Sequence, residues 1–168
     1  MKYIVKETLI SSIINALFSI AFFVGMFRHE AELLLGGTSG LTRDFLPQAF
    51  FVGLFAALPA SLVTAKRIRD NRLAPGGKMK SILPRSLPLR VLCLTLASTA
   101  LFGGCMVALL SLLEPITLGF FPALLMKAVY GVVISCAITP LAVSSQRASS
   151  RARMASAQEV GEPDRKNM

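Results

Sequence analysis

Residues 45–65 read FLPQAFFVGLFAALPASLVTA, and the residues that follow, 66–90, read KRIRDNRLAPGGKMKSILPRSLPLR. The first stretch carries no charged side chain and has no polar face, whereas the second carries eight basic residues against one acid. The hydrocarbon core of a membrane is about 30 Å thick, and a helix crosses it with about 20 apolar residues. We therefore predict that residues 45–65 form a membrane-spanning helix that is followed by a basic loop.

Three more apolar stretches of this kind lie at 9–27, 91–113 and 118–143. The first two carry no formal charge, and the third carries only Lys127. A soluble helix of such length would show a polar face. The hydrophobic fraction of the whole chain, 54%, also exceeds the roughly 45–50% that is usual for soluble domains. The sequence thus predicts an all-α integral membrane protein, built as a four-helix bundle.

The basic residues are spread unevenly among the connections between these spans. They gather before the first span, in the loop 66–90 and after the fourth span. In contrast, the connection 28–44 carries more acids than basic residues, and the turn between the third and fourth spans carries only Glu114. Loops rich in Lys and Arg stay on the cytoplasmic side of a membrane. We therefore predict that both chain termini and the basic loop are cytoplasmic.

The basic loop divides the chain into two predicted transmembrane hairpins, residues 1–65 and 91–143. In each hairpin the second helix opens with a phenylalanine two positions before a proline, Pro47 or Pro122. Both hairpins begin on the same side of the membrane, so they would be parallel repeats related by an axis along the membrane normal. The tail 144–168 is rich in Ser, Ala and charge, and we predict that it is a disordered cytoplasmic segment.

Local signals predict details within the first hairpin. Residues 30–35 are expected to form a short interfacial helix, because two glycines follow them as a stop signal. Asp44 is expected to cap the N-terminus of the second span. Pro59 lies in the middle of that span and is expected to kink it, because proline lacks an amide hydrogen and its ring clashes with the preceding turn.

The segment Asp44-Phe45-Leu46-Pro47-Gln48, which leads to Pro59 and the exit Thr64-Ala65-Lys66-Arg67, resembles a family of short two-helix bacterial membrane proteins of unknown function. The resemblance covers residues 8–72. The second hairpin would be a duplicate, but it departs from the pattern because it lacks the acid-aromatic opening and the basic exit. The resemblance implies a protein of the bacterial inner membrane and brings no known activity.

The net charge of +9 raises the question of a nucleic-acid partner. The basic residues flank apolar spans, no aromatic residues are interleaved with them, and the chain has no tryptophan. Contact with anionic lipid headgroups explains the same charge, so we predict a lipid partner and no nucleic acid. The residues expected to make this contact follow the second span directly: Lys66, Arg67, Arg69 and Arg72.

The residue types needed for catalysis or metal binding are sparse. The three cysteines all lie in apolar spans without a CxxC spacing, and the single histidine, His29, lies in an outer connection. Such a pattern favours neither a disulfide framework nor a metal site. No buried Ser or Cys has a base near it in the sequence. We therefore predict a protein that is not an enzyme and that holds no cofactor or metal.

Small residues recur at intervals of four along the spans, which favours close helix packing in lipid. Such rows serve either the bundle itself or a homodimer interface. The rows are Ala49, Gly53, Ala57 and Ser61 in the second span, Ala100, Gly104 and Ala108 in the third, and Gly131 after Lys127 in the fourth.

Lys127 is the most unusual residue, because a lysine near the centre of a membrane costs about 3 kcal/mol on insertion scales. Three alternatives stay open for it: its side chain reaches the outer surface, it pairs with carbonyls or Tyr130 inside the bundle, or it serves a function. Asn15 is the other polar residue at depth, and an interhelical hydrogen bond is its expected role.

The sequence favours a non-enzymatic accessory or scaffolding subunit. The reason is that four helices with few buried polar residues offer surfaces for helix packing rather than reactive groups. Such a subunit would bind a membrane-protein partner or a second copy of itself. The alternative is a transporter or channel for small solutes or anions, formed by a homodimer around Lys127. A third hypothesis is recruitment of anionic lipid or an acidic partner by the loop 66–90.

Overall fold

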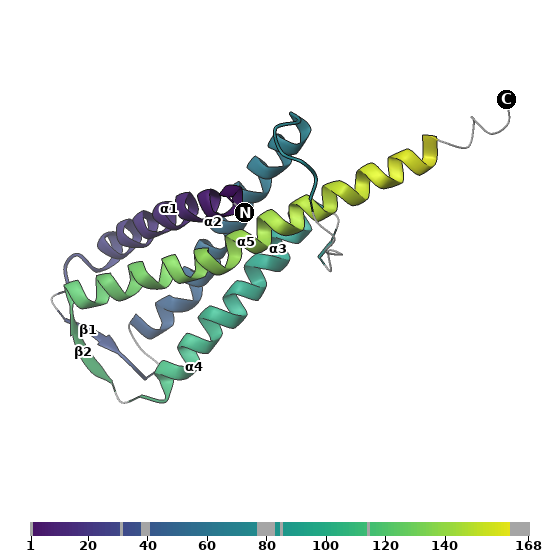
Figure 1. Cartoon of the computed structure of the whole chain (residues 1–168). Helices are drawn as coiled ribbons and strands as arrows, with labels where there is room; N and C mark the ends of the chain where they lie inside the picture. Colours follow the sequence, from purple (N-terminus) through teal and green to yellow (C-terminus); the bar gives the residue numbers. More distant parts are fainter. Residues whose placement is uncertain are drawn as a thin grey trace, which may run out of the picture.

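The computed structural model describes residues 2–30, 32–37, 41–76, 83–84, 86–113 and 115–161 (Figure 1). Long helices make up most of these residues, and one two-stranded sheet lies at an end of the molecule. The elements in chain order are α1 (Lys2–Phe27), β1 (Glu32–Leu35), α2 (Leu41–Arg69), α3 (Leu87–Ser98), the π-helix η1 (Thr99–Gly104), α4 (Cys105–Ser111), β2 (Ile116–Gly119) and α5 (Phe120–Gly161).

Among the described residues, four helical segments are long and apolar enough to cross a membrane, as the sequence predicts. They are α1, α2, the continuous run Leu87–Ser111 that joins α3, η1 and α4, and α5. Each helix is longer at one end or both than the apolar stretch that identifies it. The reason is that hydropathy marks where a chain prefers lipid, whereas backbone hydrogen bonds continue the helix into the polar boundary.

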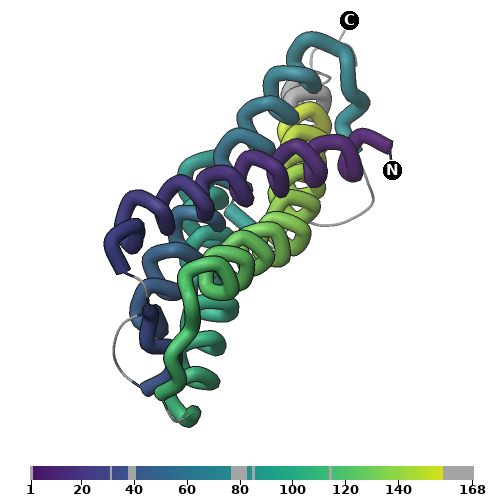
Figure 2. The backbone as a smooth tube through the Cα atoms, turned by 90° about the vertical axis from the view of Figure 1, so that its left-hand side faces the viewer, coloured from purple at the N-terminus to yellow at the C-terminus, as the bar shows by residue number. Residues whose placement is uncertain are grey.

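The helix α5 makes its most extensive contacts with two other helices. It lies along α1 and along α2, and α2 in turn packs against α3 and η1 (Figures 1 and 2). Small side chains fill the contact, so the backbones approach closely, as is usual between helices in lipid. The fully buried members of this core include Ala49, Ala56, Ala57, Ile134 and Ala142.

The two strands form an antiparallel ribbon in which Glu32 lies opposite Gly119 and Leu35 lies opposite Ile116. The interfacial helix predicted for residues 30–35 is therefore wrong, and the fourth long helix begins at Phe120 rather than at 118. Leu33 and Leu35 are buried beneath the helices. The strand pairing satisfies backbone groups that a four-residue segment could not satisfy alone. We call this end of the molecule the strand end.

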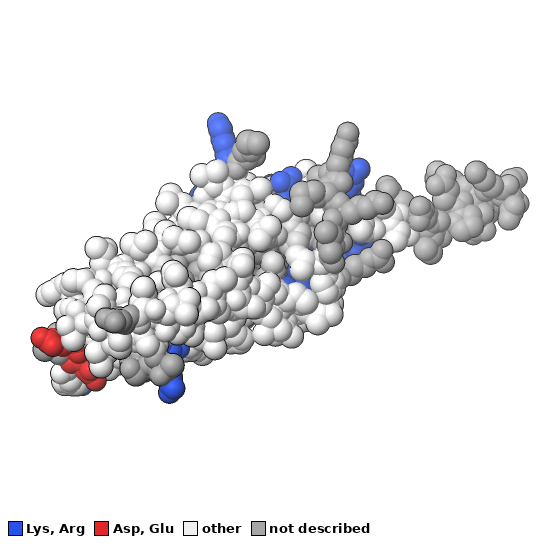
Figure 3. All heavy atoms as spheres, turned by 90° about the horizontal axis from the view of Figure 1, so that it is seen from below, with Lys and Arg blue, Asp and Glu red and all other residues white. Residues whose placement is uncertain are grey.

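The opposite end, which we call the basic end, carries the start of α1, the end of α2, the start of α3 and the protruding part of α5 (Figure 1). Figure 3 shows the visible acidic atoms at the strand end and most of the basic atoms toward the basic end. The predicted disordered tail is wrong for residues 144–161, which continue α5 as helix. Its Ser- and Ala-rich composition does not prevent a helix that the preceding turns have already nucleated. Residues 162–168 lie outside the described residues.

Two predictions about α2 have different outcomes. The helix begins at Leu41, so Asp44 lies in its first turn and is not its N-cap. Pro59 lies inside the continuous helix on an exposed face, and the kink expected there stays a prediction.

The predicted rows of small residues lie on different faces. In α2, the row that begins at Ala49 is buried, and Gly131 of α5 is buried as well. In contrast, Ala100 and Ala108 are exposed and Gly104 is half-buried. The π-helix η1 shifts the register of this span, so Gly103 is the glycine that faces Ala49. The row in the third span therefore does not pack against helices of this chain.

A substitution at Gly53 tests the contact between α2 and α3. A Cβ at Gly53 would lie 2.9 Å from both Cβ and Oγ of Ser98, and the Cβ of Ser98 can move only with its helix. We expect Gly53→Ala to lower the free energy of unfolding by about 1–3 kcal/mol, as measured by denaturation in detergent micelles. Gly25→Ala is the matched control, because a Cβ at Gly25 meets nothing within 4 Å. Equal stability of the two variants would contradict the helix contact.

Candidate functional site

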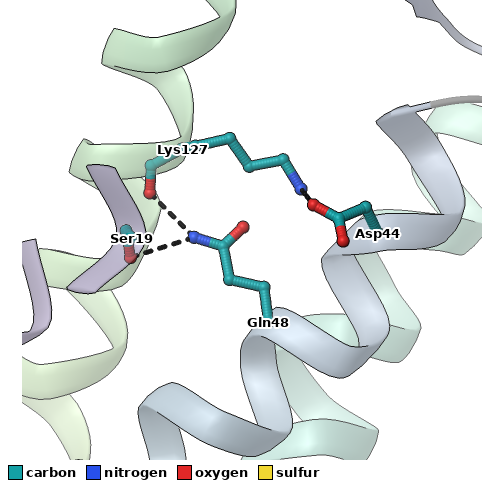
Figure 4. A network of polar contacts seen from close by, with 4 residues as sticks. All are labelled: Ser19, Asp44, Gln48 and Lys127. Carbon is teal, nitrogen blue, oxygen red and sulfur yellow. Dashed lines mark hydrogen bonds and ion pairs between the residues drawn. The ribbon is translucent and has the colours of Figure 1, made fainter. Parts of the chain in front are cut away.

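Lys127 forms an ion pair with Asp44 inside the packed helices (Figure 4). The Lys127 Nζ lies 2.8 Å from Oδ2 of Asp44, and the side-chain exposures are 1% for Lys127 and 11% for Asp44. The Lys127 Nζ also lies 3.8 Å from the ring centroid of Phe45, in cation–π geometry. The structure thus shows Lys127 paired inside the bundle rather than reaching the outer surface, with a carboxylate as partner instead of a carbonyl or Tyr130. A function for Lys127 stays a prediction.

Gln48 joins the ion pair to the third helix of the site (Figure 4). It lies one turn after Asp44 on the same face of α2. Its Nε2 donates to Oγ of Ser19 on α1 at 3.2 Å and to the backbone carbonyl of Lys127 on α5 at 3.0 Å. Its Oε1 is buried and has no hydrogen-bond partner. The Oε1 of Gln48 is thus a buried acceptor that receives no hydrogen bond from the described residues.

A cavity of about 210 Å³ opens beside these four polar residues. Its walls come from α1 and α2, and Lys127 is the residue of α5 that completes the lining. Phe18, Phe22 and Phe51 are about half exposed, so the mouth opens between α1 and α2 toward the surroundings of the helices. The remaining wall is apolar, with a complete lining of Phe18, Ser19, Phe22, Phe23, Asp44, Gln48, Phe51, Val52, Phe55 and Lys127.

Two aromatic contacts bridge the mouth of this cavity. The rings of Phe18 and Phe55 have centroids 4.7 Å apart, and those of Phe22 and Phe51 have centroids 6.5 Å apart. Each pair joins α1 to α2. The surface of the cavity is almost wholly apolar, and its entrance is aromatic. We call the four polar lining residues, Ser19, Asp44, Gln48 and Lys127, its polar floor.

Asn15 lies in a second polar layer between α1 and α5. Its Nδ2 donates to Oγ of Ser135 at 2.7 Å and to Oγ of Ser11 at 3.4 Å, and Ser11 also accepts from Thr139 at 2.9 Å. Tyr130 packs edge-on against Phe45, and its hydroxyl has no hydrogen-bond partner. The structure thus does not bring the three predicted polar residues, Lys127, Asn15 and Tyr130, into one cluster.

The residues that sequence reasoning missed are Asp44, Gln48 and Ser19. Asp44 stands at the edge of the apolar stretch, where an acid is naturally assigned to a solvated loop. Gln48 follows it by one helical turn, and that spacing was the available signal, because it places a charged and an amide side chain on one helix face. Ser19 gave no signal beyond being a small residue in a span.

The basic residues predicted to contact anionic lipid lie together at the end of α2 and just beyond it. Lys66, Arg69 and Arg72 are exposed. Arg67 is different, because it pairs with Glu7 at 3.4 Å and lies 4.9 Å above the ring of Tyr3. Their contact with lipid stays a prediction. Three further basic residues of the loop, Lys78, Lys80 and Arg85, lie outside the described residues, as does Glu114.

Lys127 and Asp44 balance each other in charge, and no cysteine or histidine lines the cavity. In the part of the chain that the structure describes, no three His, Cys, Asp or Glu residues are grouped so that they could hold a metal ion.

Comparisons with protein-family models, with curated proteins and with solved structures found no match for this chain. The resemblance of residues 8–72 to short two-helix bacterial membrane proteins therefore stays a prediction.

Proposed function

We propose that the chain is a non-enzymatic protein of the bacterial inner membrane that binds a neutral amphipathic molecule in the cavity beside Lys127. The four apolar helices support the membrane assignment. The basic end would lie in the cytoplasm, because Lys and Arg are retained there. The strand end, with Asp44 and the cavity nearest to it, would then lie toward the outer leaflet.

The polar floor selects the headgroup of the ligand. The Lys127–Asp44 pair is neutral as a unit, so an added full charge would be buried without a counter-charge at high cost. The Oε1 of Gln48 requires a donor, and the ammonium of Lys127 has N–H groups beyond the one given to Asp44. A hydroxyl or a primary amide donates and accepts at once, and therefore fits both.

The aromatic walls and the open mouth select the body of the ligand. The cavity of about 210 Å³ is smaller than the about 300–1,000 Å³ of sites that enclose a whole small molecule. It has room for the headgroup and the first part of an apolar body. The rest of that body would extend past Phe18 and Phe51 into the surrounding lipid. The observation that carries this proposal is the buried, unpaired Oε1 of Gln48 at the floor of a phenylalanine-lined cavity.

This proposal differs from a homodimeric channel around Lys127. A pathway shared by two copies would need Lys127 on an outer face of its helix, whereas its ammonium is directed to Asp44 of the same chain. The binding site of a single chain accounts for the lysine without a second copy.

Photolabelling with a long-chain alcohol tests the proposal. Hexadecanol carrying a diazirine is added to the full chain in phosphatidylcholine nanodiscs, and the labelled residues are mapped by mass spectrometry. We expect labels on the cavity walls of α1 and α2, and we expect unlabelled hexadecanol to compete while hexadecane does not. Gln48→Leu should lower the labelling at least about fivefold, because one hydrogen bond to a buried group is lost.

Leu62→Ala is the control variant, because Leu62 lies on α2 with half of its surface exposed and does not line the cavity. It should label like the unmodified chain. If hexadecane competes as strongly as hexadecanol, the proposal is contradicted, because the labelling would then depend on the apolar chain and not on the hydroxyl. That comparison uses the unmodified chain and does not depend on the folding of a variant.

The role of accessory subunit is a second candidate, and the protruding part of α5 supports it. Residues 151–156 are exposed helix in the protruding part of α5 (Figure 1). Although Arg153 also lines a small cavity, these residues form an arm that a membrane-protein partner can contact. Native mass spectrometry of the full chain and of a chain ending at residue 150, both extracted gently from the membrane, tests this role. A heteromeric complex that persists without the arm would contradict it.

A further inference from the structure

Arg90 lies near the start of α3, at the basic end. Its side chain is the largest fully buried one among the described residues, with 1% exposed. It donates to the backbone carbonyl of Ser145 at 3.4 Å and to the side-chain oxygen of Gln146, both on α5. Its Nε is buried without a hydrogen-bond partner. The guanidinium is therefore desolvated with part of its hydrogen-bonding capacity unused.

No carboxylate among the described residues forms an ion pair with Arg90. The two acids described at the basic end have other partners: Glu7 pairs with Arg67 at 3.4 Å, and Asp70 pairs with Arg69 at 3.9 Å. A buried cation without a counter-charge is strongly unfavourable. None of the carboxylates among the described residues supplies that counter-charge, whereas an anion bound beside Arg90 would.

A small cavity adjoins Arg90 and has a volume of about 90 Å³. A second guanidinium, that of Arg153, lines the same cavity, together with the Gln146 amide and the hydroxyl-bearing side chains of Ser149 and Ser150. The donors thus come from two helices, α3 and α5, and converge on a space too small for a whole lipid or nucleotide. Two guanidiniums with amide and hydroxyl donors are the set that binds oxyanions in proteins.

We propose that this cavity binds a phosphate group. A phosphate oxyanion supplies the missing negative charge and has enough acceptor oxygens for both guanidiniums at once, as a fork of parallel hydrogen bonds requires. A carboxylate has two oxygens rather than three or four, so a fork to one guanidinium leaves it fewer acceptor sites for the second. The site is separate from the cavity beside Lys127, which lies toward the other end of the helices and selects a neutral group.

The phosphate can come from a lipid headgroup or from solution. The neighbouring Lys66 and Arg69 are exposed on α2, and basic pockets between membrane helices on the cytoplasmic side bind anionic lipid headgroups. A free phosphate reaches the same donors from the aqueous side. The chemistry of recognition is the same in both cases, so the experiment has to separate the sources.

Thermal unfolding of the full chain in nanodiscs separates them. In one arm, phosphatidylglycerol replaces part of the phosphatidylcholine in a phosphate-free buffer. In the other arm, inorganic phosphate is added to pure phosphatidylcholine nanodiscs, with chloride at equal ionic strength as reference. A ligand that binds the folded state raises the unfolding temperature. A rise in the first arm alone identifies a lipid headgroup, and a rise in the second arm identifies free phosphate. No rise in either arm overturns the proposal.

A matched pair of variants on α5 locates the effect. Arg153→Gln and Arg151→Gln remove the same charge from exposed positions two residues apart, but only Arg153 lines the cavity. We expect Arg153→Gln to raise the half-maximal ligand concentration by about tenfold or more, the effect of losing a charge-assisted hydrogen bond. Arg151→Gln should change it less than about twofold. If the half-maximal ligand concentration changes equally in the two variants, the positive charge acts non-specifically, and the proposed phosphate site is contradicted.

Arg90→Gln gives a second, independent readout. We expect this variant to lose the response to the ligand that the unmodified chain shows, while its unfolding temperature without ligand stays the same or rises, because an uncompensated buried charge has been removed. A retained response to phosphate or phosphatidylglycerol in Arg90→Gln would contradict a role for Arg90 in binding.

Discussion

Replacing Asp44 alone by leucine is expected to lower the free energy of unfolding by about 3–5 kcal/mol, because it leaves the ammonium of Lys127 buried without its counter-charge. Lys127 is only 1% exposed, so water replaces the carboxylate poorly. SDS titration of the full chain in detergent micelles, followed by circular dichroism, measures the loss.

The double variant Asp44→Leu, Lys127→Met should recover most of that loss, because a buried ion pair replaced as a whole by apolar side chains is often neutral or stabilising. Lys127→Met alone should cost less than Asp44→Leu alone. The reason is that the Asp44 carboxylate is 11% exposed near the strand end and can be partly solvated once it is unpaired.

Asp70→Leu is the matched control for this cycle. Its carboxylate forms a pair with Arg69 at 3.9 Å on the surface, with side-chain exposures of 38% for Asp70 and 79% for Arg69. Such pairs contribute little, so we expect a change within about 0.5 kcal/mol. If the single losses at Asp44 and Lys127 simply add in the double variant, the two side chains do not interact in the folded protein, and the ion pair is contradicted.

The four long helices could be predicted because their signal is local. A run of about 20 apolar residues reports its own preference for lipid, whatever the rest of the chain does. The helix ends could not be predicted in the same way. The first helix begins at Lys2 rather than at residue 9, and the fourth continues through residue 161, because a helix does not have to stop where the lipid stops.

The strand ribbon and the π-helix could not be predicted, because neither has a local cause. The segments Glu32–Leu35 and Ile116–Gly119 pair only when α1, α4 and α5 have brought them together. The insertion at Thr99–Gly104 becomes visible only against α2, where it directs Gly103 toward Ala49. Counting intervals of four through this span therefore selected Ala100 and Ala108, which are on the outside.

Only one part of the candidate site, Lys127, could be predicted from the sequence. The burial cost of a lysine is a property of Lys127 alone, so its importance is apparent from the sequence. Its partner is not, because Asp44 is far away in the chain and lies at the boundary of an apolar stretch. Only the packing of α2 against α5 directs the Asp44 side chain inward, and the same packing brings Gln48 to the backbone of Lys127.

The second large effect is expected at Gly131 of α5, which lies close against α1. A Cβ at this position would lie 2.5 Å from Oγ of Ser19 and 3.4 Å from the backbone oxygen of Asn15. Gly131→Leu inserts a whole side chain there, and we expect it to lower the free energy of unfolding by about 3 kcal/mol, at the upper end of the range for overpacked positions. Gly25→Leu inserts the same side chain into α1 at an open, exposed position, and should change stability by no more than about 0.5 kcal/mol.

A smaller pair of substitutions shows which atom causes the loss at Gly131. Gly131→Ala places its methyl group against the Ser19 hydroxyl, so adding Ser19→Ala should remove the clash and restore most of the stability. The restoration should be incomplete by about 0.6 kcal/mol, the average value of an interhelical hydrogen bond in a membrane, because Gln48 then loses Ser19 as an acceptor. If Ser19→Ala does not relieve Gly131→Ala, the two helices are not in contact at this level, and Ser19 cannot belong to the same site as Gln48 and Lys127.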